Sequence, residues 1–185
     1  ETLNDGVITD EVMVNEYYRK MLIECRSMER LVGDLFILSK MQNPDFKIEK
    51  EPVSIRQVFG DVLRSAREIA RKKNITITQK LSVDDEEPCM ILGDYERLRQ
   101  MFMIIIDNAV KFSYESGEII ISIEKRITPK KQVKIYVSIQ DFGVGISKEA
   151  LPYIFEKFYK SKLKQNQKGT GLGLMIAKQI ALRHG

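Results

Sequence analysis

The stretch Lys168-Gly169-Thr170-Gly171-Leu172-Gly173-Leu174 places three glycines at alternate positions directly before an apolar helical segment. Glycine lets the backbone approach a ligand closely, and the amide groups at a helix N-terminus bind phosphate. Two polar patterns precede it: Asn108 and Lys111 in a predicted helix, and Asp141-Phe142-Gly143-Val144-Gly145 after a predicted strand. Each pattern alone is weak evidence. In this order the three predict a nucleotide site.

The composition predicts one globular domain with an appendage, because 185 residues with 43% apolar content can bury a core. The longest apolar run, Met101–Ile106, is far shorter than the roughly 20 residues of a membrane span. Cys25 and Cys89 lack metal-ligand spacing, so we expect both to be buried and reduced. These features predict a soluble, cytoplasmic fragment without direct membrane contact. The modest net charge of +4, mixed in sign, argues against a nucleic-acid partner.

The first 43 residues predict a long helix over Thr9–Met41 with Thr9 as its cap. Its apolar residues alternate three and four apart, which is typical of a helix-bundle seam: Val14, Tyr18, Met21, Cys25, Met28, Val32 and Leu35. Such a helix needs a partner. Asn43-Pro44-Asp45 breaks the pattern, and we place the domain boundary there, between residues 1–43 and 44–185.

The second region alternates helical and strand patterns. We expect strands over 46–53, 75–81, 118–125 and 133–139, and helices over 54–73, from Asp94 onward and over 172–183. Ser54 and Gln57 form a capping-box start for the first of these helices. The expected core face of the second is Leu98, Met101 or Phe102, Ile105, Ala109 and Phe112. The result is an α+β fold with helices on one face of a mixed or antiparallel sheet.

Asp141 continues the inward series of the strand over 133–139, so a carboxylate is predicted to point at the core. That is costly unless a donor meets it, and the exocyclic amine of adenine would serve. The alternative is a strand-end aspartate that caps the following turn. Gly143 and Gly145 favour a ligand site.

Asn108 and Lys111 lie on one face of their predicted helix. The Asn108 carbonyl oxygen suits Mg²⁺ that phosphate oxygens already hold, and Lys111 one turn later could meet the phosphates. An exposed polar helix face is the alternative. Downstream, five lysines (157, 160, 162, 164 and 168) predict either a mobile lid over a polyphosphate or a solvated loop.

Several familiar sites are poorly supported. The chain has no P-loop sequence, its glycine spacing differs from the dinucleotide fingerprint, and Asp141-Phe142-Gly143 lacks the companions of a eukaryotic-type kinase. The single histidine, His184, supports neither a catalytic triad nor a histidine metal cluster. We expect it to be a helix-terminal residue favoured by the helix dipole.

The patterns resemble the catalytic ATP-binding domain of bacterial two-component sensor histidine kinases. Residues 107–113 resemble the N box of that family, 141–146 its G1 box, 154–160 its F box and 169–174 its G2 box. Residues 29–35 are similar to the end of the family's dimerisation and histidine-phosphotransfer hairpin. The resemblance implies a two-layer α/β sandwich of the histidine kinase/gyrase type behind a long bundle helix.

The resemblance also implies roles at matching positions. Asn108 would be the Mg²⁺ ligand, Lys111 and Lys160 would contact phosphate, and Asp141 would receive the adenine amine. Phe112, Gly143, Gly145, Ile146 and Tyr159 would shape the base pocket and its surroundings. Gly169, Thr170, Gly171, Leu172 and Gly173 would close on the phosphates. Phe155 and Phe158 would anchor the hinge of a lid.

Three features of this chain differ from the family's pattern and bear on these roles. Many relatives have Asn where this chain has Ile104, and related ATPases have a water-activating glutamate there, so Ile104 favours phosphate transfer over hydrolysis. The phosphoacceptor histidine is expected upstream of Glu1. Two closing strands that relatives carry after His-Gly are missing, which predicts an uncovered sheet edge.

We therefore expect a protein histidine kinase that uses ATP and Mg²⁺ and phosphorylates a histidine for relay to a response-regulator aspartate. A homodimer through the helical bundle is implied for the intact protein. The sequence leaves open whether that protein is membrane-anchored. The alternatives are a gyrase- or chaperone-type ATPase and a non-catalytic interaction module with a vestigial nucleotide pocket.

Overall fold

The computed structural model describes residues 10–43, 45–81, 89–127, 129, 133–161 and 169–185. The elements in chain order are α1 (Glu11–Gln42), β1 (Glu51–Ser54), α2 (Ile55–Arg71), β2 (Thr76–Leu81), β3 (Met90–Gly93), α3 (Tyr95–Phe112), β4 (Glu118–Ile127), β5 (Val133–Asp141), the short 3₁₀ helix η1 (Leu151–Tyr153) and α4 (Gly173–His184). The strand expected over 46–53 is wrong in extent, because β1 begins only at Glu51. Thr9 lies outside the described residues, and Asp10 caps α1 by accepting from the Val12 N–H.

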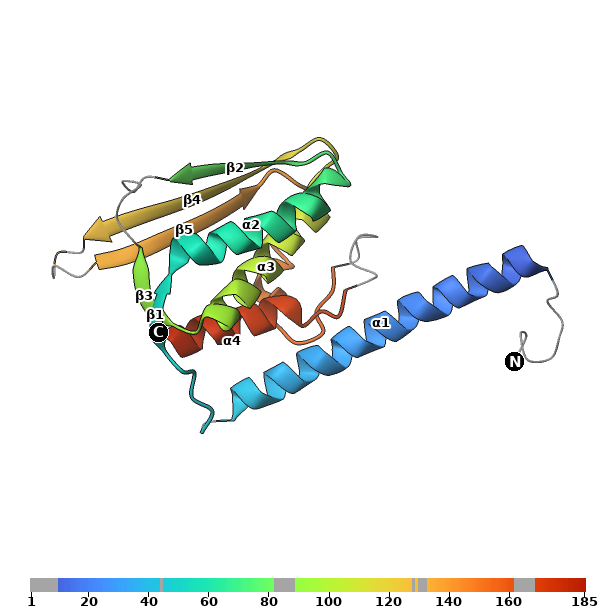
Figure 1. The fold of residues 1–185 in the computed structure, drawn as a ribbon, viewed down its shortest axis with the longest axis horizontal. Helices are drawn as coiled ribbons and strands as arrows, with labels where there is room; N and C mark the ends of the chain where they lie inside the picture. The colour runs from blue at the N-terminus through green and yellow to red at the C-terminus, as the bar shows by residue number, and fades with distance from the viewer. Residues whose placement is uncertain (1–9, 44, 82–88, 128, 130–132, 162–168) are drawn as a thin grey trace.

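The main sheet has the order β2-β4-β5, with β2 parallel and β5 antiparallel to β4. It is therefore mixed, and β1 and β3 form a separate antiparallel pair. Helices α2, α3 and α4 lie on the same side of the main sheet (Figure 1). Alternation along β4 turns Ile119, Ile121 and Ile123 towards this side, where all three are fully buried. The predicted α+β sandwich is confirmed.

The core forms between α2, α3 and the sheet. Ser54 caps α2 by accepting from the Gln57 N–H at 3.4 Å, as the capping box predicts. The buried face of α3 consists of Leu98, Phe102, Ile106, Ala109 and Val110. The expected burial of Ile105 and Phe112 is wrong, since both are only half-buried. This buried stripe packs against α2 and the sheet, whereas α4 contacts Met101 and Ile104 on another side of α3.

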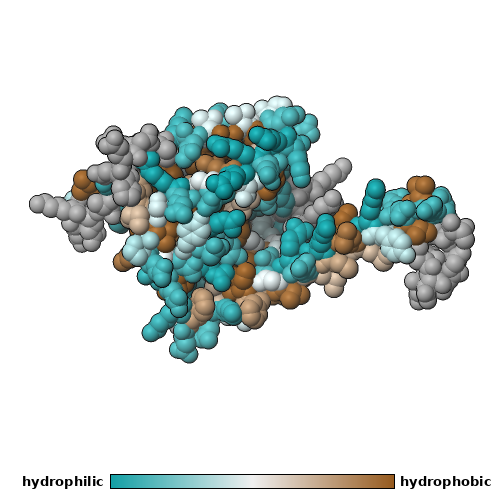
Figure 2. All heavy atoms as spheres, in the orientation of Figure 1, coloured by the Kyte–Doolittle hydropathy of each residue, from teal (hydrophilic) through white to brown (hydrophobic). Residues whose placement is uncertain are grey.

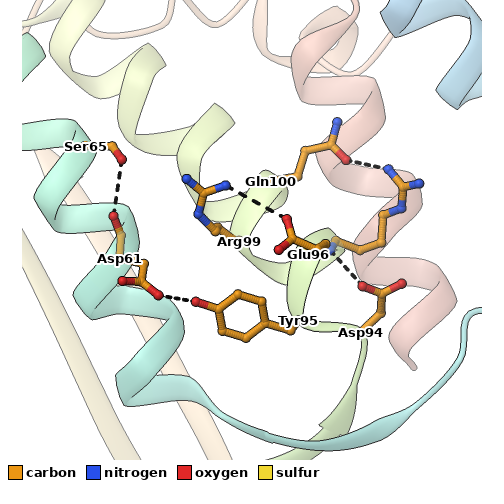
Figure 3. Close-up of polar contacts among 8 residues, drawn as sticks. Asp61, Ser65, Asp94, Tyr95, Glu96, Arg99 and Gln100 are labelled. Carbon is orange, nitrogen blue, oxygen red and sulfur yellow. Dashed lines mark hydrogen bonds and ion pairs between the residues drawn. The ribbon is translucent and has the colours of Figure 1, made fainter.

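Polar contacts fix the start of α3 (Figure 3). Asp94 accepts from the Arg97 N–H at 3.0 Å, so the predicted helix start at Gly93-Asp94 is confirmed. The Tyr95 hydroxyl donates to the Asp61 carboxylate of α2, and this bond raises the pKa of Tyr95. The contact ties α2 to α3 beside the core.

His184 joins the end of α4 to the start of α3. Its Nε2 accepts the Asp94 N–H at 3.0 Å, and its Nδ1 lies 2.7 Å from the Ile180 carbonyl oxygen. Because a carbonyl can only accept, Nδ1 carries the proton. A side chain at Gly93 would lie 2.8 Å from Leu98 and 3.0 Å from the imidazole. His184 is therefore more than the dipole-favoured terminal residue that the sequence suggests.

Helix α1 contacts the domain only over its last turns, and the rest extends away from it (Figure 1). Leu38 and Met41 are buried against Leu172, Ile176 and Ile180. The predicted seam lies on another stripe and is exposed, with large apolar side chains along the surface of α1 in Figure 2. Cys25 is exposed with it, so its expected burial is wrong, whereas Cys89 is buried as expected. No helix of the described chain is long and apolar enough to cross a membrane.

Candidate nucleotide site

The N-box residues lie in the last two turns of α3. Asn108 and Lys111 are both half-buried, and Lys111 also lies 4.8 Å from the centre of the Phe112 ring. Burial lowers the pKa of the Lys111 ammonium; nearby Asp107 opposes this shift and Lys160 adds to it. The N-box and F-box lysines are thus close enough to repel each other. An anion between them would relieve that repulsion.

The G1 loop meets the C-terminal end of α3 through backbone contacts. The Val144 N–H donates to the Phe112 carbonyl oxygen at 3.1 Å. A Cβ at Gly143 would lie 2.2 Å from that same oxygen, which is closer than any side chain can come. Gly143 is therefore required by the close approach of two backbones, and this approach brings the N-box and G1 patterns together.

Asp141 departs from the sequence prediction. It is the last residue of β5, in register with Ile119, but its side chain is exposed. Its Oδ1 accepts the Gly143 N–H at 3.0 Å, which is the turn-capping contact that the sequence left as an alternative. The predicted burial is wrong because the strand ends at this residue and the carboxylate turns towards its own loop. A role towards adenine stays a prediction.

The glycine-rich G2 segment contacts both the F box and α3. Gly171 has a positive φ of 74°, and a Cβ there would lie 2.8 Å from the Phe158 backbone. Phe158 itself has a positive φ of 62°, which is uncommon for a bulky residue. A Cβ at Gly173 would lie 3.2 Å from the Ile104 side chain. The fully buried Leu172 is the N-cap of α4 and anchors the segment.

The remaining predicted residues are less closely connected. Tyr159 is half-buried and its ring stacks on Tyr153, with 6.1 Å between centroids. Ile146 is exposed, and a Cβ at Gly145, whose φ is 69°, would have nothing within 4 Å. Lys162, Lys164 and Lys168 lie outside the described residues, so the predicted lid stays a prediction.

Helix α1 reaches the site through two polar contacts. The Thr170 hydroxyl donates to Asp34 at 2.8 Å and accepts the Leu172 N–H at 3.3 Å. Lys157 of the F box donates to the Gln42 side chain at 3.2 Å. The G2 and F segments are therefore attached to the helix that precedes the domain.

At its end, α1 is also held by the guanidinium of Arg183. Arg183 donates to the carbonyl oxygens of Met41, Asn43 and Phe46 at 2.7–2.9 Å. Sequence reasoning missed Arg183 and Asp34. Asp34 lies within the 29–35 segment that resembles the hairpin end, but that resemblance assigns it no contact with the site, and Arg183 belongs to none of the motifs. Both act between segments more than 130 residues apart.

The sequence profile of the family described as "Histidine kinase-, DNA gyrase B-, and HSP90-like ATPase" matches residues 93–185. That range covers half of the chain and includes all four boxes. The chain belongs to this family.

Sensor kinases are among the relatives of this chain. The phosphate regulon sensor protein PhoR of Pseudomonas aeruginosa is 30% identical over 186 aligned positions, which cover all of this chain and 40% of PhoR. Sensor histidine kinase WalK of Bacillus subtilis is 29% identical over all of this chain and 30% of WalK. The chain thus spans less than half the length of these relatives, and the predicted resemblance to sensor histidine kinases is confirmed.

Solved structures agree with this assignment. Full-length ShkA, crystallised in complex with AMPPNP, superposes with a TM-score of 0.70 at 27% identity, over 91% of this chain and 34% of ShkA. The catalytic domain of histidine kinase ThkA superposes with a TM-score of 0.59 at 27% identity, over 74% of this chain and 82% of that domain. The predicted histidine-kinase ATPase fold is confirmed.

Proposed function

We propose that this chain binds Mg-ATP where the end of α3, the loop after β5 and the N-terminal end of α4 meet. In the whole protein, the γ-phosphate passes to a histidine and then to an aspartate of a response regulator. The observation that carries the proposal is the close approach of three glycines to other segments: Gly143 to Phe112 of the N box, Gly171 to Phe158 of the F box and Gly173 to Ile104 of α3. Family membership supports ATP as the nucleotide.

The residues present suit a magnesium nucleotide. The positive charge of Lys160 helps lower the pKa of Lys111, so the two ammonium groups lie close enough for a polyphosphate to interact with both. The described residues contain no group of three His, Cys, Asp or Glu side chains that could hold a metal. Mg²⁺ would therefore take most of its ligands from phosphate and water, with the Asn108 amide oxygen as a protein ligand. Bound there, the ion would neutralise charge on the phosphates.

Ile104 favours transfer to an acceptor over hydrolysis. Its side chain packs in the apolar cluster with Leu172 and Ile176, so this position offers no group that could activate water. The domain would act by positioning the nucleotide and excluding a competing attack. A gyrase-type ATPase is the less favoured alternative, since the relatives found are sensor kinases.

The acceptor would be a histidine elsewhere in the whole protein. Both ring nitrogens of His184, the one histidine of this sequence, are engaged with backbone groups of α3 and α4. The exposed apolar stripe of α1 would pair with helices of the same bundle in a homodimer. Such a bundle would present the acceptor histidine both to ATP and to a response-regulator receiver domain.

Thermal unfolding with and without Mg-ATP tests the binding step. A ligand at about 100 times its Kd adds roughly 2.7 kcal/mol of stability. Asn108→Ala should remove the magnesium-dependent part, whereas Asn15→Ala on the exposed part of α1 should leave it unchanged. Absence of any shift in the wild-type chain would favour the non-catalytic module and overturn the proposal.

The whole protein tests the transfer step. Incubation with γ-labelled ATP should give an acid-labile phosphoprotein, and added receiver domain should remove the label. Multiple-turnover phosphate release without a phosphoprotein would favour the ATPase alternative.

A further inference from the structure

Lys73, just after α2, contacts the end of α3 that carries the N box. Its Nζ donates to the carbonyl oxygen of Lys111 at 2.7 Å, of Val110 at 3.1 Å and of Ser113 at 3.4 Å. The ammonium is half-buried between the ends of the two helices. None of the sequence patterns includes Lys73.

The end of α2 fixes the place of Lys73. The Ile75 N–H donates to the Ala70 carbonyl at 3.0 Å, and the Asn74 N–H donates to Arg71 at 3.1 Å. Asn74 has a φ of 55°, so these bonds form a Schellman motif with a left-handed residue after the helix. The carbonyl of Lys73 itself accepts the Ser116 N–H at 3.0 Å. Lys73 is thus bound to the segment after α3 by its backbone as well as its side chain.

The last four carbonyls of a helix have no partner within the helix. In α3 each of these four carbonyls accepts a hydrogen bond from a residue that lies beyond the helix or in another segment. Ser113 donates to Ala109 through its N–H and hydroxyl, and the Val144 N–H donates to Phe112. The Lys73 ammonium donates to the two carbonyl oxygens between them, those of Val110 and Lys111. Its positive charge at this end of α3 also interacts favourably with the helix dipole.

The contacts of Phe112 with the G1 loop make the exact course of this turn important. The Phe112 carbonyl is the group that a Cβ at Gly143 would strike at 2.2 Å, so even a small shift of the turn displaces the loop. The same turn carries the side chains of Lys111 and Phe112. A residue that holds this turn therefore sets the N box relative to the G1 loop.

We infer that Lys73 is a positioning residue for nucleotide binding. It fixes the last turn of α3 through the Val110 and Lys111 carbonyls, so that the N-box side chains and the G1 loop keep one arrangement. The inference rests on the proposed ATP site. It assigns Lys73 no contact with the nucleotide itself.

The test measures ATP affinity by calorimetry at a temperature where every variant is folded. Lys73→Met keeps the aliphatic stem and removes the donors, Lys73→Arg restores a cationic donor, and Lys72→Met changes the exposed neighbouring lysine. Lys73→Met should raise the Kd about tenfold, which is the lower end of the effect that outer partners of metal ligands have on metal affinity. Lys73→Arg should recover most of the affinity, and Lys72→Met should match the wild type. Should Lys73→Met fail to fold, Lys73→Gln replaces it.

A spectroscopic readout separates positioning from general stability. In the nucleotide-free protein, Lys73→Met should shift the amide resonances of Gly143 and Val144, and a purely stabilising residue would leave them in place. A wild-type chain that binds ATP together with an unchanged Kd in Lys73→Met overturns the inference alone. A wild-type chain that does not bind ATP overturns the proposed function.

Discussion

The sandwich core and the loops at the end of α3 are held in place in different ways. In the core, apolar side chains such as Phe59, Val62 and Ile121 are completely buried. In the loops, Phe142, Phe155 and Phe158 are 41–54% exposed. The position of these loops depends instead on backbone contacts at Gly143 and Gly171. Side-chain volume therefore determines stability in the first region, whereas backbone geometry determines the arrangement of the site in the second.

The largest expected effect comes from the core. Phe59 is fully buried and its ring centre lies 4.4 Å from that of Phe102. Phe59→Ala should lower the free energy of unfolding by about 3–5 kcal/mol, since it removes apolar contact and leaves a cavity. Urea unfolding measures the loss, with Phe36→Ala on the exposed part of α1 as the control. Equal losses in the two variants would contradict the assigned core.

The next effect should fall on the site. Gly143→Ala forces a Cβ against the Phe112 carbonyl, and such overpacking costs about 1–3 kcal/mol. ATP affinity should fall at least as strongly, because the N box and G1 loop separate. Gly60→Ala is the matched control: its Cβ would have nothing within 4 Å, and alanine in a helix stabilises by about 0.8–1 kcal/mol. Unimpaired ATP binding by Gly143→Ala would show that the contact is dispensable.

A smaller effect tests the attachment of α1. Asp34→Ala removes the acceptor of the Thr170 hydroxyl, a charged hydrogen bond that typically contributes about 1.5–3 kcal/mol before solvent exposure reduces it. Hydrogen exchange at the Leu172 amide should accelerate, while exchange in β4 should not change. Glu29→Ala, at an exposed position of the same helix, is the control. Unchanged exchange at Leu172 would mean that α1 does not restrain the G2 segment.

The smallest effect concerns Lys111. Burial lowers its pKa in the folded chain below the ordinary 10.5, so the unfolded chain holds more protons between these two values. Stability should therefore rise with pH across that window, and below it the burial penalty is constant. Lys111→Met should remove this pH-dependent rise and also weaken ATP binding. Urea unfolding from pH 7 upward gives the comparison, and an identical pH profile in both proteins would contradict it.

Much of the fold could be predicted from local patterns. Alternation in β4 and β5, the cap at Ser54 and the start at Asp94 act over a few residues, and each predicts its element correctly. The buried stripe of α3 could not be fully predicted. Its shift from Ile105 to Ile106 follows from packing against α2 and the sheet, and such contacts between separate segments are not visible in the local periodicity.

The candidate site also has features that the sequence predicts and features that it does not. The glycines are predicted to let the backbone approach a ligand, and in the structure Gly143 and Gly171 approach other backbone segments while Gly145 has nothing within 4 Å of its Cβ position. The burial of Asp141 could not be predicted by extending strand alternation, because the strand ends there and the side chain turns back to the Gly143 N–H. Lys73 belongs to no motif, and the resemblance over 29–35 gives Asp34 no contact with the site, since a single lysine or aspartate in a helix pattern is indistinguishable from a solvated one. The division at residue 43 stays a prediction.

The most direct test of the nucleotide site follows backbone amide resonances during titration with Mg-ATP. We predict saturable shifts at Asn108, Lys111, Gly143 and Gly171 together, whereas Ser122 and Ser138, on the face of the sheet that points away from the helices, should stay unaffected. Shifts confined to one of these motifs, or absent from all of them at saturating nucleotide, would contradict it.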